Sequence, residues 1–253
     1  ITPSVTPTNT VTPTNTNTPT PSTTPSFVSD NLQFYLSPSS YIGSGTVWDT
    51  SVGSTDATLS GSPTYNLSSG FTFNGTTQYG RIPSVSNVTD FTGPQNYTVE
   101  VWFRADVGQP SATLGTILEK WNQNNQSRYP YVFRFNETSG SVSVAAYDGT
   151  NNPTTTISGF STGQWYQSVG VYNFSTQLLT QYRNGTSGST ASLVGLGSLS
   201  NTSSVGIAHR ISTAGATQFM FKGTIAIVRI YDSALTSSQV LQNFNFNKSN
   251  FGL

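Results

Sequence analysis

The chain has 253 residues with ten basic and ten acidic side chains, and charged residues make up only 8% of it. A neutral chain without a basic stripe cannot neutralise a phosphate backbone, which excludes nucleic acid as a partner. The absence of cysteine excludes a disulfide framework, and no apolar run reaches the length of a membrane span, so we expect no membrane insertion. Aromatic residues still make up 12% of the chain, enough for a folded core. Because the chain opens at Ile1 without an apolar leader, we expect a mature or trimmed form.

Residues 1–26 form a low-complexity segment rich in threonine and proline, called the arm below. The hexapeptide Val-Thr-Pro-Thr-Asn-Thr at residues 5–10 is repeated at residues 11–16. Polyproline II has three residues per turn, so prolines spaced by six lie on one edge of an extended rod. At ~3.1 Å per residue, such a rod would reach roughly 80 Å. The prolines on this edge are Pro7, Pro13, Pro19 and Pro25.

Two interpretations of the arm stay open. A Ser/Thr/Pro composition is typical of a flexible linker or an O-glycosylated stalk. In the other interpretation, the arm docks on a neighbouring subunit or on its own domain. Under the first interpretation, the threonines before the repeated prolines are candidate glycosylation sites: Thr6, Thr12, Thr18 and Thr24.

From residue 27 to residue 253, short runs of alternating apolar and polar residues are separated by turn residues, which predicts an all-β sandwich. The Asn184-Gly185 pair is one of several turns that tolerate positive φ. One C-terminal helix is predicted, because Thr236 can cap it and Gln239 follows three residues later. The predicted strands are Leu32–Leu36, Gly70–Phe73, Tyr97–Arg104, Thr116–Lys120, Tyr131–Asn136, Ser141–Tyr147, Tyr166–Tyr172, Leu178–Arg183 and Thr224–Tyr231.

Blocks rich in aromatic residues and glycine follow one another through this domain: Asn31–Leu36, Gly45–Asp49, Phe71–Gly75, Tyr97–Phe103, Ile117–Lys120, Gly163–Tyr166, Tyr182–Gly185, Phe221–Gly223, Val228–Tyr231 and Ala234–Thr236. Together they resemble laminin-G-like modules of the concanavalin A-like lectin and glucanase class, including those of phage, large-virus and bacterial surface proteins. The resemblance covers residues 30–253. It implies a two-sheet antiparallel jelly-roll sandwich with a concave face, and a role in glycan recognition, protein recognition or surface architecture.

The chain departs from this family where acidic residues are usual. Residues 76–78 and 226–227 carry no carboxylate. Calcium prefers carboxylate and carbonyl oxygens, so these departures weaken the calcium site that the family implies. With no cysteine and His209 as the only histidine, we expect no metal ligand set and no cofactor.

The sequence does not predict catalysis. Jelly-roll glycosidases need two carboxylates across a cleft. The three glutamates, Glu100, Glu119 and Glu137, have no acidic neighbour two to five residues away. A Ser-His-Asp triad would have to use His209, which we expect to be structural. We therefore expect a protein that is not an enzyme.

The central strand at residues 97–104 carries a binding hypothesis. Alternation places every second residue from Tyr97 in the core and the intervening side chains on the other face, which a jelly roll makes concave. An aromatic ring beside a carboxylate and a guanidinium suits a sugar. The alternative is structural: Trp102 packs beneath a loop and Glu100 pairs with Arg104. The candidate ligand-binding residues are Glu100, Trp102 and Arg104, with Trp121, Tyr129 and Tyr131 beside a polar loop.

Two functions from different classes remain. The first is a structural subunit of an extracellular or virion-surface filament, fibre or coat, in which the arm contacts neighbours. The second is a lectin-like adhesion module on a stalk. Both predict an extracellular, cell-surface or virion-surface location, with other copies, neighbouring surface proteins or glycans as partners. Ten Asn-X-Ser/Thr sequons add possible N-glycosylation, with Asn74, Asn136 and Asn184 as candidates.

Overall fold

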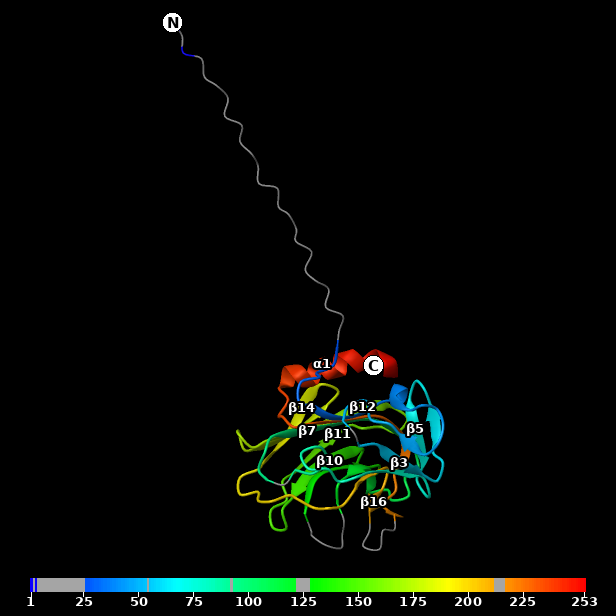
Figure 1. Cartoon of the computed structure of the whole chain (residues 1–253). Coiled ribbons are helices and arrows are strands. Elements are labelled where there is room, and N and C mark those ends of the chain that lie inside the picture. The colour runs from blue at the N-terminus through cyan, green and yellow to red at the C-terminus, as the bar shows by residue number, and fades with distance from the viewer. Residues whose placement is uncertain (2, 4–25, 54, 92, 122–127, 212–216) are drawn as a thin grey trace.

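The computed structural model describes residues 1, 3, 26–53, 55–91, 93–121, 128–211 and 217–253 (Figure 1). The predicted polyproline II conformation of the arm, the edge formed by Pro7, Pro13, Pro19 and Pro25, and the candidate glycosylation sites Thr6, Thr12, Thr18 and Thr24 lie outside the described residues.

Two antiparallel sheets stack face to face, which confirms the predicted jelly-roll sandwich (Figure 1). Sheet A has the strand order β14-β13-β12-β7-β18-β5-β4, and β1 also pairs with β18. Its strands are β1 (Leu32–Leu36), β4 (Thr64–Asn66), β5 (Gly70–Asn74), β7 (Tyr97–Ala105), β12 (Trp165–Asn173), β13 (Leu178–Arg183), β14 (Thr186–Ser192) and β18 (Lys222–Tyr231).

Sheet B has the strand order β11-β10-β9-β8-β15-β6-β3-β2. Its strands are β2 (Val47–Trp48), β3 (Ala57–Ser60), β6 (Tyr79–Ile82), β8 (Gly115–Glu119), β9 (Tyr129–Asn136), β10 (Ser141–Tyr147), β11 (Thr154–Ser158) and β15 (Val205–Ile207). A separate two-stranded ribbon pairs β16 (Arg210–Ile211) with β17 (Thr217–Gln218).

All nine predicted strands are present, because each combines alternation with β-branched or aromatic residues. The remaining strands of the two sheets and the ribbon were not predicted: β2, β3, β4, β6, β11, β15, β16 and β17. Strand β14 was also missed, because its sequence, TSGSTAS, has no apolar alternation. The Asn184-Gly185 turn has the predicted positive φ at both positions, 50° and 76°, which suits a tight hairpin between β13 and β14.

The core lies between the two sheets and is dominated by aromatic rings. On β7, Val99, Val101 and Phe103 point into it and are fully buried. Tyr97 stacks between Phe91 and Tyr172, with ring centroids 4.2 Å and 4.3 Å away. Such close aromatic packing fixes how the two sheets sit on each other.

Helix α1 (Ser237–Asn247) continues into the 3-10 turn η2 (Lys248–Phe251) and covers the outer face of sheet A (Figure 1). The predicted capping box is present: the Thr236 hydroxyl accepts from the Gln239 backbone N–H, and the Gln239 side chain accepts from the Thr236 N–H. Among the described residues, no helix is both long and apolar enough to span a membrane.

Candidate binding groove

Glu100 and Trp102, the centre of the predicted sugar platform, are fully buried. They do lie on the face of β7 that points away from the core, but α1 and η2 cover this face. The ring of Trp102 stacks 5.8 Å from Phe244 and 4.8 Å from Phe251. The expectation of an open platform is therefore wrong, because the C-terminal helix occupies the space that a sugar would need.

The Glu100 carboxylate is the centre of a buried polar network. Its Oε1 accepts from Trp102 Nε1 at 2.7 Å, Gln167 Nε2 at 2.9 Å and Arg229 Nη1 at 3.0 Å. Its Oε2 accepts from Asn243 Nδ2 of α1 at 2.8 Å. Burial by itself lowers the pKa of Arg229, but the Glu100 carboxylate together with the hydroxyls of Tyr35 and Tyr231 more than offsets this and holds that pKa above its ordinary value. The network fastens α1 to sheet A.

Arg104 is not part of this network, although the sequence offered it as the partner of Glu100. Its Nε lies 3.8 Å from Asp106 Oδ1, and its guanidinium lies 5.8 Å from the ring centre of Trp165. Its side chain is 38% exposed, so it is the one member of the predicted trio with substantial access to solvent.

The aromatic residues predicted to flank the platform belong to sheet B. Tyr131 is in the core, and its hydroxyl donates to the Thr89 carbonyl at 3.0 Å. Trp121 and Tyr129 meet edge to face on the outer side of sheet B, with ring centroids 5.7 Å apart. The six predicted ligand-binding residues are therefore divided among the core and the two outer faces, and do not form one site.

Two arginines already occupy the Trp121 side of sheet B. The guanidinium of Arg210 lies 4.0 Å from the Trp121 ring centre and that of Arg134 lies 5.4 Å from it. Glu119 joins the two arginines, with Oε1 2.6 Å from Arg210 Nε and Oε2 2.8 Å from Arg134 Nε. We call these four residues the sheet B stack. Both arginines are already held by the Glu119 carboxylate and the Trp121 ring, so we assign the stack a structural role.

The remaining titratable candidates also have structural partners. His209 is fully buried, its Nδ1 lies 3.1 Å from the Arg210 carbonyl oxygen, and burial lowers its pKa to about 4. The Glu137 carboxylate accepts from the backbone N–H groups of Gly108 and Gln109. Among the described residues, no three His, Cys, Asp or Glu side chains cluster as a metal site would require.

The candidate N-glycosylation residues differ in exposure. Asn74 is exposed, and its Nδ2 donates to Thr77 Oγ1 at 3.0 Å. Asn136 and Asn184 are half-buried, with side-chain oxygens that accept backbone N–H groups. Their modification stays a prediction.

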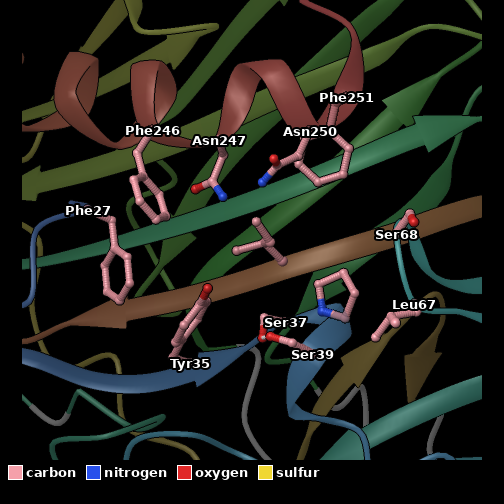
Figure 2. Close-up of a pocket in the computed structure, with 12 residues that line it drawn as sticks. Phe27, Tyr35, Ser37, Ser39, Leu67, Ser68, Phe246, Asn247, Asn250 and Phe251 are labelled. Atoms are coloured by element: carbon pink, nitrogen blue, oxygen red, sulfur yellow. Dashed lines mark hydrogen bonds between the residues drawn. The ribbon is translucent and has the colours of Figure 1, made fainter. Parts of the chain in front are cut away.

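A groove of about 640 Å³ opens where α1 and η2 face β1, the 3-10 turn η1 (Pro38–Ser40) and the β4–β5 turn (Figure 2). This volume lies in the range of pockets that hold small ligands. We call it the C-terminal groove. It is lined by Phe27, Tyr35, Ser37, Pro38, Ser39, Leu67, Ser68, Ile227, Phe246, Asn247, Asn250 and Phe251. None of these side chains is charged.

The aromatic wall of the groove is preformed by packing. The ring of Phe27 lies 5.0 Å from Tyr35 and 5.5 Å from Phe246, centroid to centroid. Beneath them the Arg229 guanidinium lies 4.5 Å from the Phe27 ring centre and 4.7 Å from that of Tyr35. Because Arg229 is held by Glu100, the buried network also supports the groove.

Amide and hydroxyl groups complete the lining. Asn247 Oδ1 accepts from Arg229 Nη2 at 2.7 Å, which turns its NH₂ group towards the groove (Figure 2). Asn250 is exposed, and its NH₂ group also points inwards (Figure 2). Ser37, Ser39 and Ser68 contribute hydroxyls. The groove thus offers apolar rings and neutral hydrogen-bonding groups in one concave surface.

Comparison with protein families matches residues 74–241 to Laminin_G_3, a model of the concanavalin A-like lectin/glucanases superfamily. The chain belongs to this superfamily. A search of curated protein sequences finds no significant match.

Solved structures share the superfamily's fold with this chain. The Botulinum neurotoxin serotype D ligand binding domain, solved with N-acetylneuraminic acid, matches with a TM-score of 0.68 and 11% identity, over 85% of this chain and 51% of that chain. A Trypanosoma rangeli sialidase matches with a TM-score of 0.62 and 16% identity, over 87% of this chain and 33% of that chain. This chain thus spans about half or less of the solved chains it matches, and at these identities the likeness shows the fold alone.

The residues of the C-terminal groove were missed by sequence reasoning, although the superfamily resemblance included the final segment. A signal was present in the helix. Phe244 on α1 and Phe251 on η2 face the same way and cover Trp102. Phe246 lies off that face and is free to line a second surface. A helical segment with more aromatic residues than one buried face can hold therefore indicates a second aromatic surface.

Proposed function

We propose that the protein is a non-catalytic, lectin-like module that binds neutral oligosaccharides in the C-terminal groove. Membership of the lectin/glucanase superfamily supports carbohydrate binding in general. A solved neighbour was determined with N-acetylneuraminic acid, which supports a sugar as the class of ligand. Such a module would act outside the cell or on a virion surface, as an adhesion or surface component.

The observation that carries this proposal is the uncharged, aromatic lining of the groove. A sugar ring presents an apolar face of C–H groups and an edge of hydroxyls. The C–H face can stack on the rings of Phe27, Tyr35, Phe246 and Phe251. The hydroxyl edge can accept hydrogen bonds from the inward NH₂ groups on α1 and η2 (Figure 2). The absence of charge favours a neutral sugar over an acidic one.

The proposal does not include glycosidase activity, because each glutamate is already held. Glu100 and Glu119 are fully buried in ion pairs, and Glu137 accepts two backbone N–H groups on a loop. None of the three lines the groove. A pair of carboxylates across the groove would be needed for hydrolysis.

A glycan array followed by calorimetry with the bound sugars tests the proposal. We expect binding of neutral oligosaccharides, weakened about tenfold in Asn250→Ala because one neutral hydrogen-bonding group is lost. Asn245→Ala is the matched control, since Asn245 is also exposed on the C-terminal helix but does not line the groove. Absence of any glycan ligand, or equal affinity in both variants, would contradict the proposal.

A second candidate function is the assembly of copies into a filament, fibre or coat. It is favoured by one observation: Phe27, the second residue after the last proline of the arm, forms part of the groove wall. The base of the arm and the groove therefore lie on the same side of the domain.

A further inference from the structure

We propose that the C-terminal groove binds the Thr/Pro arm of a second copy of this chain, through the repeat at Val5–Thr16. This inference rests on the proposed function only in that both use the same groove as a ligand site. It names a partner for that site, and it connects the aromatic lining of the groove to a sequence feature that sugar binding does not use.

The arm and the groove match in their chemistry. Residues 1–26 contain no charged side chain, and neither does the lining of the groove. Proline-rich segments in polyproline II conformation dock on grooves lined by aromatic rings, because the preformed rod loses little entropy on binding. Phe27, Tyr35, Phe246 and Phe251 supply such rings around one opening. The oxygen atoms of the threonine hydroxyls and asparagine amides between the prolines can accept hydrogen bonds from the NH₂ groups of Asn247 and Asn250.

The arm is periodic in sequence. In the predicted polyproline II rod, the identical hexapeptides at residues 5–10 and 11–16 would present the same edge twice. A groove that accepts one hexapeptide also accepts the next, so the arm offers two equivalent registers.

The position of the arm's base favours the arm of a second copy over the chain's own arm. The base of the arm is fixed, because Gln242 Nε2 donates to the Ser26 carbonyl at 2.9 Å and the Val28 N–H donates to Asn243 Oδ1 at 2.8 Å. At ~3.1 Å per residue, residues 5–16 of a polyproline II arm would lie roughly 30–65 Å from Ser26. A domain of this size has a radius of gyration of about 17 Å.

The chain's own repeat would therefore have to reverse direction to reach its own groove. The prolines in the intervening stretch, among them Pro19, Pro21 and Pro25, bias each preceding residue to extended geometry and oppose such a reversal. The repeat of a neighbour meets no such constraint. The resulting contact is heterologous, head to tail, and propagates from copy to copy.

A complementation experiment with full-length chains tests this inference. One variant, with Pro7, Pro13 and Pro19 all replaced by alanine, keeps the groove and loses the arm edge. The other, Asn250→Ala combined with Phe246→Ala, keeps the arm and loses groove contacts, and circular dichroism checks that both fold. We expect the unchanged chain to associate with increasing concentration in analytical ultracentrifugation, each variant alone to stay monomeric, and their mixture to form a dimer. Monomers throughout, or self-association of the groove variant equal to that of the unchanged chain, would overturn the proposal.

A synthetic peptide of residues 5–16 separates this inference from sugar binding. We expect the peptide to bind the arm variant, with about tenfold weaker binding when Asn250→Ala is added and no change when Asn245→Ala is added. A scrambled peptide is the composition control. Glycan binding without peptide binding would overturn the arm contact and keep the proposed function. Peptide binding without any glycan ligand would keep the arm contact and remove the proposed function.

Discussion

The two outer faces of the sandwich use the same kinds of residues in different ways. Sheet A carries Glu100 with Arg229 and Trp102, and sheet B carries Glu119 with arginines and Trp121. On sheet A, α1 covers the cluster, and both side chains of the ion pair are fully buried. On sheet B no helix of the described residues covers the stack, and the Arg134 side chain keeps 18% exposure. A glutamate, an arginine and a tryptophan on one sheet face therefore do not define a sugar site, whether or not α1 covers them.

The largest expected effect is on sheet A. Glu100→Ala leaves the Arg229 guanidinium buried without its carboxylate, and we expect a loss of about 3–5 kcal/mol in the free energy of unfolding. Urea denaturation followed by tryptophan fluorescence measures it. Asp30→Ala, which removes an exposed carboxylate, is the control and should change stability by less than about 0.5 kcal/mol. A loss as small as that of the control would show that the network does not hold α1.

An effect of similar size is expected from pH on the sheet B side. The pKa of His209 falls from 6.5 to about 4 on folding because the ring is buried. The unfolded chain therefore binds the additional proton between these two values, so stability decreases as pH falls from about 6.5 to about 4. The expected loss is about 3 kcal/mol. Denaturation at several pH values measures the slope, and His209→Gln should remove most of it; an unchanged slope would point to other groups.

A smaller effect is expected in the sheet B stack itself. Glu119→Ala removes the carboxylate that accepts hydrogen bonds from two arginines. The Arg134 side chain stays partly exposed to solvent, however, and both guanidinium groups stay in contact with the Trp121 ring. We expect a loss of about 2 kcal/mol, less than for Glu100→Ala. The same denaturation experiment compares the two variants. If Glu119→Ala costs as much as Glu100→Ala, the helix is not what distinguishes the two faces.

The smallest effect on stability is expected at the groove. Asn250 is exposed, so Asn250→Ala should change the free energy of unfolding by less than about 0.5 kcal/mol. Thermal unfolding measures this change beside the binding experiments. A large loss of stability would mean that weaker binding in this variant reports on folding and not on the ligand.

Much of the fold could be predicted from the sequence because alternation and capping are local signals. The alternation along β7 separated Val99 and Phe103 from Glu100 and Trp102 correctly, and the Thr236 cap placed the helix. Alternation cannot say what covers a face. The Glu100–Asn243 hydrogen bond joins residues 143 positions apart, and no local pattern contains it.

The groove was unpredictable for the same reason. Its wall joins Phe27 at the base of the arm to Phe246 and Phe251 near the end of the chain. Only the pairing of β1 with β18 and the packing of α1 on sheet A bring these segments together. The arm lies outside the described residues, and its extended conformation stays a prediction from its prolines.

The attachment of the arm's base to α1 also has a mechanical meaning. A pull on the arm enters the domain at Ser26 and Val28, which are bonded to Gln242 and Asn243. Asn243 passes the load to Glu100 in the middle of sheet A, while the strands of sheet B carry none of these bonds. Tension along a chain of copies would therefore act first on the helix and on sheet A.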